Sequence, residues 1–253
     1  SARPPLGASF PASLDPRLAE ALRAHGIIQL YSHQAQAFEL IEKGHHLVVV
    51  TPAASGKTLC YNLPVLQGLI QTPEARVLYL FPTKALAQDQ LAELEELARA
   101  LSDIRMFTYD GDTPQDARRA VRARASLVLT NPDMLHSGIL PHHTKWLNLF
   151  QNLRYVVIDE LHAYRGVFGS HLANLITRLK RLCHFYGSAP RFIMASATIA
   201  NPGELAQRLL IDLHGFLKLA DVLFGNDPSL RSAFLAVLRR EHPWIPTRMP
   251  CLP

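Results

Sequence analysis

Apolar runs alternate with helical stretches along most of the chain. Six runs are almost continuously apolar: 47–50, 76–81, 104–109, 126–130, 155–158 and 191–195. The clearest helical stretches between them are 84–100, 114–123 and 169–186. Strands that are apolar on both faces and alternate with helices are typical of a parallel sheet covered by helices on both sides. The sequence therefore predicts an α/β fold with a mostly parallel central sheet.

Helices are expected before and after this alternation. One begins with Asp15 as N-cap and ends before Gly26, and a second runs from Ser32 to a stop at Gly44. Two amphipathic helices are expected over 213–241, followed by a proline-rich end. The predicted parts are an N-terminal extension with helices over 1–45, a main lobe over 46–212, and a short helical appendage over 213–253.

Composition places few limits on function. The chain has 253 residues, 48% of them hydrophobic, and a net charge of +5, which is compatible with an anionic partner. Its cysteines, Cys60, Cys183 and Cys251, lie far apart, which argues against a disulfide framework or a cysteine-rich zinc site and favours a reducing compartment. No apolar run approaches the length of a membrane span, so we expect a cytoplasmic protein.

The stretch "LVVVTPAASGKTLCY", 47–61, joins a buried strand to a helix through a turn. The N-terminus of such a helix favours a phosphate group. Lys57 is the candidate to contact the phosphates of a nucleotide, and the Thr58 hydroxyl is the candidate ligand of Mg²⁺. Thr51 stands where the usual pattern has glycine, so by itself the turn equally suits a surface lysine. The residues expected to surround the phosphates are Pro52, Ala53, Ala54, Ser55 and Gly56.

The run "YVVIDELH", 155–162, is a buried strand that ends in two carboxylates. An acidic pair at the carboxyl end of a strand suits a site at the edge of a parallel sheet. Asp159 is the candidate to hold Mg²⁺, and Glu160 to orient or deprotonate an attacking water. Alone, this pair is an ordinary strand-to-loop junction. Together with the Gly-Lys-Thr turn, it predicts phosphoryl transfer.

Small polar residues follow three more strands. "FIMASATIANP" places two hydroxyls at a strand end, "YLFPTKALAQDQ" places Lys84 at the start of a helix, and "LVLTNPDML" adds a threonine and an asparagine. Lys84 is a candidate contact to a nucleic-acid phosphate. Taken singly, each of these segments would be a loop followed by a helix cap.

The order of these elements resembles the first RecA-like lobe of the DEAD/DEAH-type superfamily 2 helicases. The matching segments are "AASGKT", "PTKALAQDQ", "YDGDT", "TNPDML", "DELH" and "SAT", and the resemblance covers roughly residues 28–212. "YSHQAQAF" resembles the upstream adenine-recognition element. "DELHAYRGVFGSHLANLITRL" is most similar to DNA helicases that, in full length, carry a second RecA-like lobe and a C-terminal zinc-binding domain.

The resemblance implies ATP and Mg²⁺ as cofactors and a role for each matched position. Gln34 is implied to read the adenine, and Asp159 and Glu160 to form the Walker B pair. Positions implied to couple nucleotide state to strand binding are His162, Ser196 and Thr198. Positions implied near the nucleic acid are Pro82, Thr83, Lys84, Gly111, Asp112, Thr130, Asn131, Arg165 and Phe168. Tyr164 or Phe168 is the candidate to stack on a base, and filling the core is the equal alternative for Phe168.

Three departures from the family pattern affect the expected function. Ala53 stands where close relatives have threonine, residues 213–253 match nothing in the family, and no second lobe is found in these residues. In this superfamily ATP binds between two lobes, and an arginine finger contributes about 10³–10⁵-fold in rate in related systems. We therefore expect binding of ATP and weak binding of nucleic acid, with DNA favoured, but no unwinding by this chain alone.

Two other functions are possible from the sequence. The chain could be a non-catalytic binding subunit whose segment 213–253 docks a partner that supplies the second lobe. It could also be a different P-loop enzyme, such as a small-molecule kinase. A lid with clustered arginines would favour the kinase, and the sequence has none.

Overall fold

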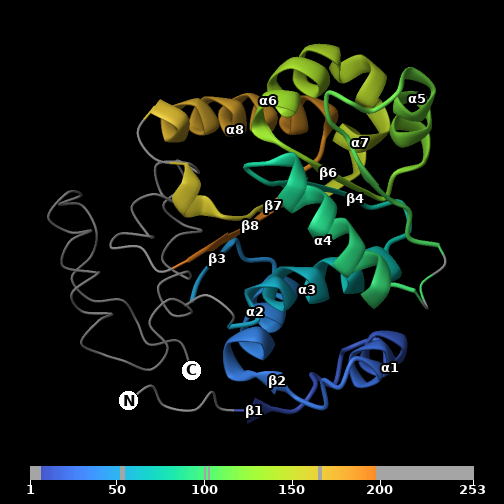
Figure 1. The fold of residues 1–253 in the computed structure, drawn as a ribbon, viewed down its shortest axis with the longest axis vertical. Helices are drawn as coiled ribbons and strands as arrows, with labels where there is room; N and C mark the ends of the chain where they lie inside the picture. Colours follow the sequence, from blue (N-terminus) through green and yellow to red (C-terminus); the bar gives the residue numbers. More distant parts are fainter. Residues whose placement is uncertain (1–6, 52–54, 100, 102, 165–166, 198–253) are drawn as a thin grey trace, which may run out of the picture.

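The computed structural model describes residues 7–51, 55–99, 101, 103–164 and 167–197. Its centre is a six-stranded parallel sheet with the strand order β3-β8-β7-β4-β6-β5 (Figure 1). The strands are β3 Leu47–Val50, β4 Arg76–Leu80, β5 Met106–Thr108, β6 Leu127–Thr130, β7 Leu153–Ile158 and β8 Arg191–Ser196. A separate antiparallel pair joins β1 Gly7–Ala8 to β2 Leu30–Tyr31. The predicted α/β fold with a mostly parallel sheet is confirmed.

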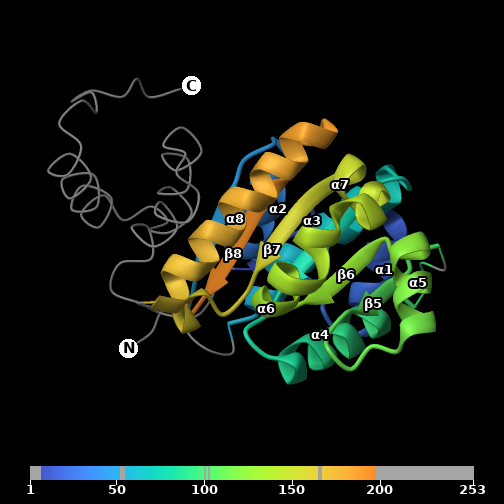
Figure 2. The ribbon, with the colours of Figure 1, turned by 90° about the horizontal axis from the view of Figure 1, so that it is seen from above.

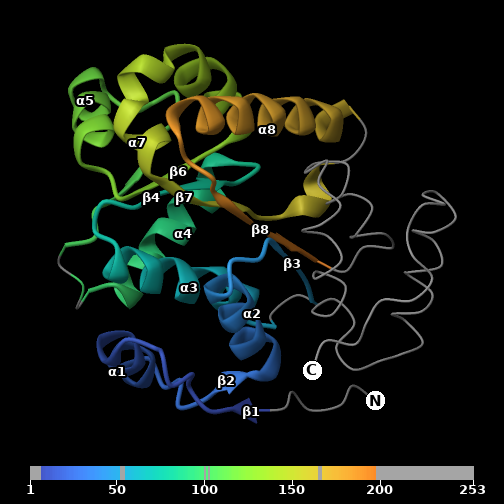
Figure 3. The same ribbon diagram turned by 180° about the vertical axis from the view of Figure 1, so that it is seen from behind.

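Helices cover both faces of the sheet. Figures 1 and 3 show α5, α6, α7 and α8 on one side and α2, α3 and α4 on the other, with α1 outside α3. The longer helices are α1 Pro16–Ala24, α2 Ser32–Glu42, α3 Lys57–Gln71, α4 Lys84–Leu97, α5 Gln115–Arg124 and α8 Val167–Tyr186. The short ones are α6 Pro132–Met134, the π-helical η1 Leu135–Ile139, the 3-10 helices η2 Leu140–Trp146 and η3 Leu161–Ala163, and α7 Leu147–Asn152.

The strands other than β5 are largely buried on both faces because helices cover both, and β5, at the edge of the sheet, is half-buried. All four residues of β6 are buried, as are five of the six residues of β7. The covering helices present leucines to the sheet, among them Leu63 and Leu66 on α3 and Leu172 and Leu179 on α8, each with no exposed surface. Strands of this kind must be apolar throughout, which explains why the runs in the sequence do not alternate with polar residues.

The strand order divides the carboxyl edge of the sheet into two halves. β3, β8 and β7 are neighbours, so the Gly-Lys-Thr turn, Ser196 and Asp159 lie at one half. β4, β6 and β5 are neighbours at the other half, where Lys84, Asn131 and the loop after Thr108 lie. The fold therefore separates the predicted nucleotide residues from most of the predicted nucleic-acid residues, and the exception is Phe168, which follows β7 at the start of α8.

Helix boundaries agree closely with the sequence predictions, with one exception. Asp15 caps α1, whose first residue is Pro16, as predicted. Between β6 and β7 the chain forms four short helical segments that the sequence analysis did not predict, because Pro141 and two adjacent histidines interrupt the apolar periodicity. The helices expected over 213–241 lie outside the described residues. In the part of the chain that the structure describes, no helix combines the length and apolarity needed to span a bilayer.

Candidate functional site

The turn before α3 requires glycine at Gly56 for two reasons. Gly56 caps the helix with φ 73° and ψ 30°, in the left-handed region that side chains disfavour. A Cβ atom there would lie 2.6 Å from Gln34 Nε2. Ser55 Oγ donates to Thr51 Oγ1 at 2.6 Å, and this hydrogen bond connects the two ends of the turn. Lys57 follows as the first residue of α3. Pro52, Ala53 and Ala54 lie outside the described residues.

Gln34 ties this turn to α2. The side chain is 3% exposed, its Nε2 donates to Gly56 O at 2.9 Å, and its Oε1 accepts from Tyr31 N at 2.8 Å. His33 adds a second contact, with Nε2 lying 3.2 Å from Ser55 O. The structure thus places the predicted adenine-reading residue against the predicted phosphate turn.

Asp159 is a largely buried carboxylate at the end of β7. It is 9% exposed, its Oδ2 accepts from the Tyr61 hydroxyl at 2.8 Å, and its Oδ1 accepts from Glu160 N at 2.7 Å. Burial raises the pKa of Asp159 above its usual value, while the Tyr61 hydrogen bond acts in the opposite direction. A carboxylate in this environment is stabilised by any cation that approaches it.

Glu160 lies between two predicted functional residues. Its backbone has φ 51°, the one positive φ at a non-glycine position among the described residues. Strain of this kind is common where a side chain must be aimed for function. Glu160 Oε1 lies 3.9 Å from Lys57 Nζ, and Oε2 lies 3.1 Å from His162 Nδ1. The structure therefore brings Lys57, Asp159, Glu160 and His162 together.

His162 also connects β7 to the end of β8. Ala197 N donates to His162 Nδ1 at 3.3 Å, and the same nitrogen faces Glu160. Nδ1 accepts from Ala197 N when it carries no hydrogen and donates to Glu160 when it carries one, but it cannot do both at once. Ser196 Oγ is buried nearby and has no hydrogen-bond partner among the described residues. Thr198 lies outside them.

Tyr61 is a site residue that the sequence analysis missed. Besides Asp159, its hydroxyl lies 3.2 Å from Gln90 Oε1 on α4, and the side chain of Thr58 interacts with it as well. Gln90 Nε2 donates in turn to Glu93 Oε2 at 2.9 Å. Tyr61 lies in an apolar run that indicates only a buried helix, and a polar partner for it cannot be recognised without the fold.

The other half of the edge holds Lys84 and the loop after β5. Lys84 is the first residue of α4, Thr83 caps that helix by accepting from Leu86 N, and Pro82 precedes both. Lys84 Nζ forms an ion pair with Asp112 Oδ2 at 2.6 Å. Gly111 is exposed beside this pair. The structure brings these predicted residues together at the surface.

Thr130 and Asn131 serve local structure. Thr130 is 2% exposed and its hydroxyl donates to Tyr109 O at 2.6 Å, so the side chain that was expected to be available is enclosed. Asn131 is half-buried and caps α6 by accepting from Met134 N at 2.8 Å. In this structure, any nucleic-acid contact at this strand end falls to Asn131 or to the backbone.

The two aromatic candidates after the acidic pair differ in exposure. Phe168 is 71% exposed, so the core-filling alternative is wrong for it in this structure. Tyr164 is 4% exposed, its hydroxyl has no hydrogen-bond partner among the described residues, and its burial raises its pKa. Phe168 is thus the aromatic side chain accessible for stacking. Arg165 lies outside the described residues.

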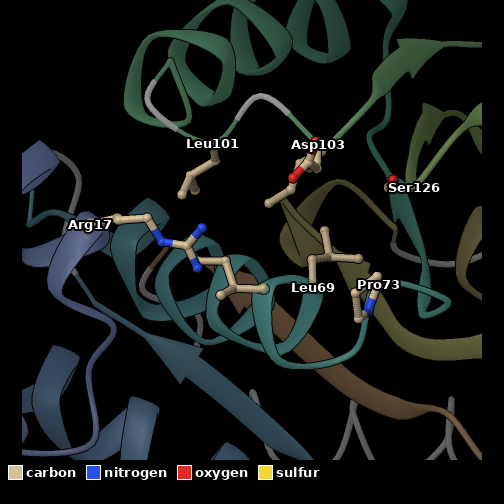
Figure 4. Close-up of a pocket in the computed structure, with 8 residues that line it drawn as sticks. Arg17, Leu69, Pro73, Leu101, Asp103 and Ser126 are labelled. Atoms are coloured by element: carbon tan, nitrogen blue, oxygen red, sulfur yellow. The ribbon is translucent and has the colours of Figure 1, made fainter.

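A small cavity at the opposite edge is separate from this site. It encloses about 100 Å³ at the amino ends of the strands (Figure 4). Arg17 of α1, Leu69 of α3 and Asp103 before β5 contribute to its wall. None of the predicted site residues lines it, so it provides no alternative location for the chemistry.

Comparison with known proteins gives a consistent result. The family model described as DEAD/DEAH box helicase matches residues 31–205. The chain is 62% identical over 201 residues to the "Uncharacterized ATP-dependent helicase YprA" of Bacillus subtilis, covering 79% of this chain and 27% of that protein. It is 45% identical over 181 residues to the ATP-dependent helicase HRQ1 of Saccharomyces cerevisiae, covering 68% of this chain and 16% of that protein.

A solved structure is similar over most of the described residues. The DUF1998 helicase MrfA, bound to DNA and AMPPNP, superposes with a TM-score of 0.80 at 60% identity, covering 82% of this chain and 29% of that one. The matched region therefore spans 27%, 16% and 29% of the length of these three relatives.

Proposed function

Because the chain belongs to the DEAD/DEAH box helicase family, we propose that it is the ATP-binding and nucleic-acid-binding RecA-like lobe of an ATP-dependent DNA helicase. One observation carries the proposal: Lys57 at the start of α3 meets Glu160, which follows Asp159 at the end of β7. A lysine at a helix N-terminus and an acidic pair at a strand end are the parts that phosphoryl transfer requires. The similarity to ATP-dependent helicases supports the same conclusion.

The cofactors we propose are ATP and Mg²⁺, and the residues present fit both. The buried Asp159 carboxylate, whose pKa is raised by burial, suits a divalent cation that would compensate its charge. Thr58 supplies the second oxygen ligand, Lys57 contacts phosphate, and Gln34 contacts the adenine. Bound ATP supplies the phosphoryl group, and the chain's own residues bind and orient it.

Glu160 and His162 are the proposed link between hydrolysis and strand binding. Glu160 orients the attacking water from its position between Lys57 and His162. When the nucleotide site changes, the hydrogen bond of His162 Nδ1 switches between Glu160 and Ala197 N. This switch transmits the change to the segment that contains Ser196 and Thr198. This role rests on a hydrogen bond that only one of two partners can hold.

We place the nucleic acid across the carboxyl ends of β4, β6 and β5. Pro82, Thr83, Lys84, Gly111, Asp112 and Asn131 lie there, and Phe168 is exposed for stacking on a base. DNA is favoured because the structure of MrfA was solved with DNA. No membrane contact is proposed, and the buried thiols of Cys60 and Cys183 suit a reducing cytoplasm.

Unwinding by these 253 residues alone is not proposed. In this superfamily ATP is enclosed between two lobes, and the described residues form one of them. A complete site needs a second lobe, either elsewhere in the same protein or in another chain. The second case is the alternative function: a binding subunit that docks a partner which supplies that lobe.

Single-stranded DNA binding tests the proposal. A fluorescein-labelled oligonucleotide titrated with the chain should show weak binding that falls steeply with salt, because one lobe makes only a few phosphate contacts. An RNA oligonucleotide of the same sequence is the control for DNA preference. Tight binding that persists at high salt would contradict this account. ATP hydrolysis restored by adding a separate second-lobe polypeptide would favour the alternative function.

A further inference from the structure

A basic cavity of about 430 Å³ lies beyond β5, the edge strand of the sheet. Its wall comes from α5, from the loop after β5, and from the helical segments η1 and η2; α5 lies beside β5 in Figure 2. No described aspartate or glutamate lines it. Four basic residues do, namely Arg118, Arg122, His142 and Lys145. Gly111, one of the proposed nucleic-acid contacts, forms part of the rim.

Arg118 makes one wall of this cavity rigid. Its Nη2 donates to Asp110 O and Gly111 O at 3.1 Å each, and its Nε donates to Thr113 O at 2.8 Å. The guanidinium also lies 5.3 Å from the centre of the Tyr109 ring. Arg118 therefore holds the loop after β5 in shape. Its hydrogen bonds go to backbone carbonyls and not to a carboxylate.

Two aromatic rings form the inner part of the cavity. Tyr109 and Trp146 pack edge to face with their centres 4.8 Å apart, and Trp146 Nε1 donates to Gly138 O at 3.3 Å. Gly138 belongs to the π-helical turn η1, a conformation that is rare and frequent at functional sites. The cavity is therefore preformed by packed side chains rather than by a loose loop.

Arg122 and Lys145 are the two cations at this cavity whose hydrogen-bond donors are not used by the framework. Neither forms an ion pair or a side-chain hydrogen bond with another described residue, whereas Lys84 on the same half of the edge is paired with Asp112. Two such cations at a preformed cavity favour an anion, and the planar guanidinium of Arg122 matches the oxygens of a phosphate. The strongest indication that the cavity takes a ligand is that Arg118, Arg122 and Lys145 line one cavity to which no described carboxylate contributes.

We propose that this cavity binds a backbone phosphate of the nucleic-acid strand as the strand leaves the carboxyl edge past β5. This inference rests on the proposed function, since the strand must already lie across β4, β6 and β5. Gly111 joins the two regions, because it lines the cavity and lies beside Lys84. Phosphate contacts set position without reading bases, so the cavity adds length to the strand-binding surface but no sequence preference.

The test compares two double variants of equal charge. Arg122→Ala/Lys145→Ala removes the two unpaired cations, and Lys43→Ala/Arg99→Ala removes two exposed cations at the opposite edge of the sheet. Single-stranded DNA binding is measured by anisotropy over a salt series. We expect the cavity variant to bind about 5-fold more weakly than the control variant, and its slope of log K against log salt to be smaller by about 0.7–1.4, the value for one or two phosphate contacts.

A charge-retaining variant, Arg122→Lys/Lys145→Arg, separates charge from shape. We expect it to keep most of the affinity and most of the salt slope. If it loses as much as the alanine variant, or if the cavity variant matches the Lys43→Ala/Arg99→Ala control, the phosphate site is wrong. DNA binding by the unchanged chain would then still support the proposed function. If the unchanged chain binds no DNA at low salt, the nucleic-acid part of the proposed function fails together with this inference.

Discussion

At the scale of single residues, Tyr61 links the two halves of the carboxyl edge. Its one hydroxyl proton faces two acceptors, Asp159 Oδ2 at 2.8 Å and Gln90 Oε1 at 3.2 Å. Only one of them can receive a full hydrogen bond at a time. Asp159, at the end of β7, and Gln90, on α4, therefore compete for the Tyr61 hydroxyl proton.

Tyr61→Phe tests how strongly Asp159 depends on this donor. Hydrogen bonds to charged groups contribute about 1.5–3 kcal/mol, and those between neutral groups about 0.5–1.5 kcal/mol. The matched control is Tyr79→Phe, because the Tyr79 hydroxyl is equally buried and donates to the neutral Asn62 Oδ1 at 3.0 Å. We expect urea unfolding to show a larger loss for Tyr61→Phe. Equal losses would contradict a charge-assisted bond to Asp159.

The site residues that could be predicted from sequence are those with local signals. Helix starts carry Lys57 and Lys84, and a strand end carries Asp159, so residue type and spacing suffice for them. Tyr61 and Gln90 could not be found in this way. Their contact joins the successive helices α3 and α4, and it becomes visible only when the packing of these helices is known.

At the scale of elements, the strands were predictable because helices bury both faces of the sheet except at its half-buried edge strand β5. The apolar run at 47–50 coincides with β3, and the others match within a few residues. Residues 132–152 were not predictable, since their short helices are held by tertiary contacts such as those of Trp146 with Tyr109 and of His143 with Tyr186. Pro64 inside α3 gives a further example, because a proline in the middle of a helix usually predicts an interruption.

The covering helices α3 and α8 each bury one thiol, which makes their packing testable. Burial raises the pKa of Cys60 from 9.0 to about 12 and that of Cys183 to about 11. Since the thiolate is the reactive form, we expect iodoacetamide at pH 8 to leave both unmodified in the folded chain and to modify both in urea. Peptide mass spectrometry measures this. Modification of Cys60 at the same rate with and without urea would contradict the packing of α3.

The same shifts predict how stability depends on pH. The folded pKa of each thiol lies above the unfolded value of 9.0. The unfolded chain therefore loses these protons first, and the free energy of unfolding decreases as the pH rises above about 9. Comparison of the urea midpoint at pH 8 and pH 10 checks the direction. A midpoint that rises over this range would contradict it.

At the scale of the whole molecule, the strand order determines which strand ends become neighbours. The order β3-β8-β7-β4-β6-β5 gathers the nucleotide candidates on one half of an edge and the nucleic-acid candidates other than Phe168 on the other. The sequence predicts that all these residues lie at carboxyl ends of strands, but it does not predict this order. The basic cavity beyond β5 was missed for the same reason, because its cations come from α5 and η2.

A lobe without a partner should hydrolyse ATP slowly. We expect steady-state hydrolysis by the 253-residue chain to stay near background, with or without single-stranded DNA, because an arginine finger contributes about 10³–10⁵-fold in related systems. Release of phosphate is the measurement. The variants Arg239→Ala and Arg240→Ala, in a segment outside the described residues, are the controls. Robust DNA-stimulated turnover that either variant abolishes would contradict the account.

The central claim, that ATP and Mg²⁺ bind where α3 and β7 meet, is tested most directly by thermal unfolding of the chain and of Lys57→Ala. A ligand present at 100 times its dissociation constant stabilises the native state by about 2.7 kcal/mol, which is a shift of several degrees. We predict this shift for the unchanged chain and for the control Lys43→Ala, whose lysine is exposed at the opposite edge, and no shift for Lys57→Ala. An equal shift in Lys57→Ala would contradict the nucleotide site.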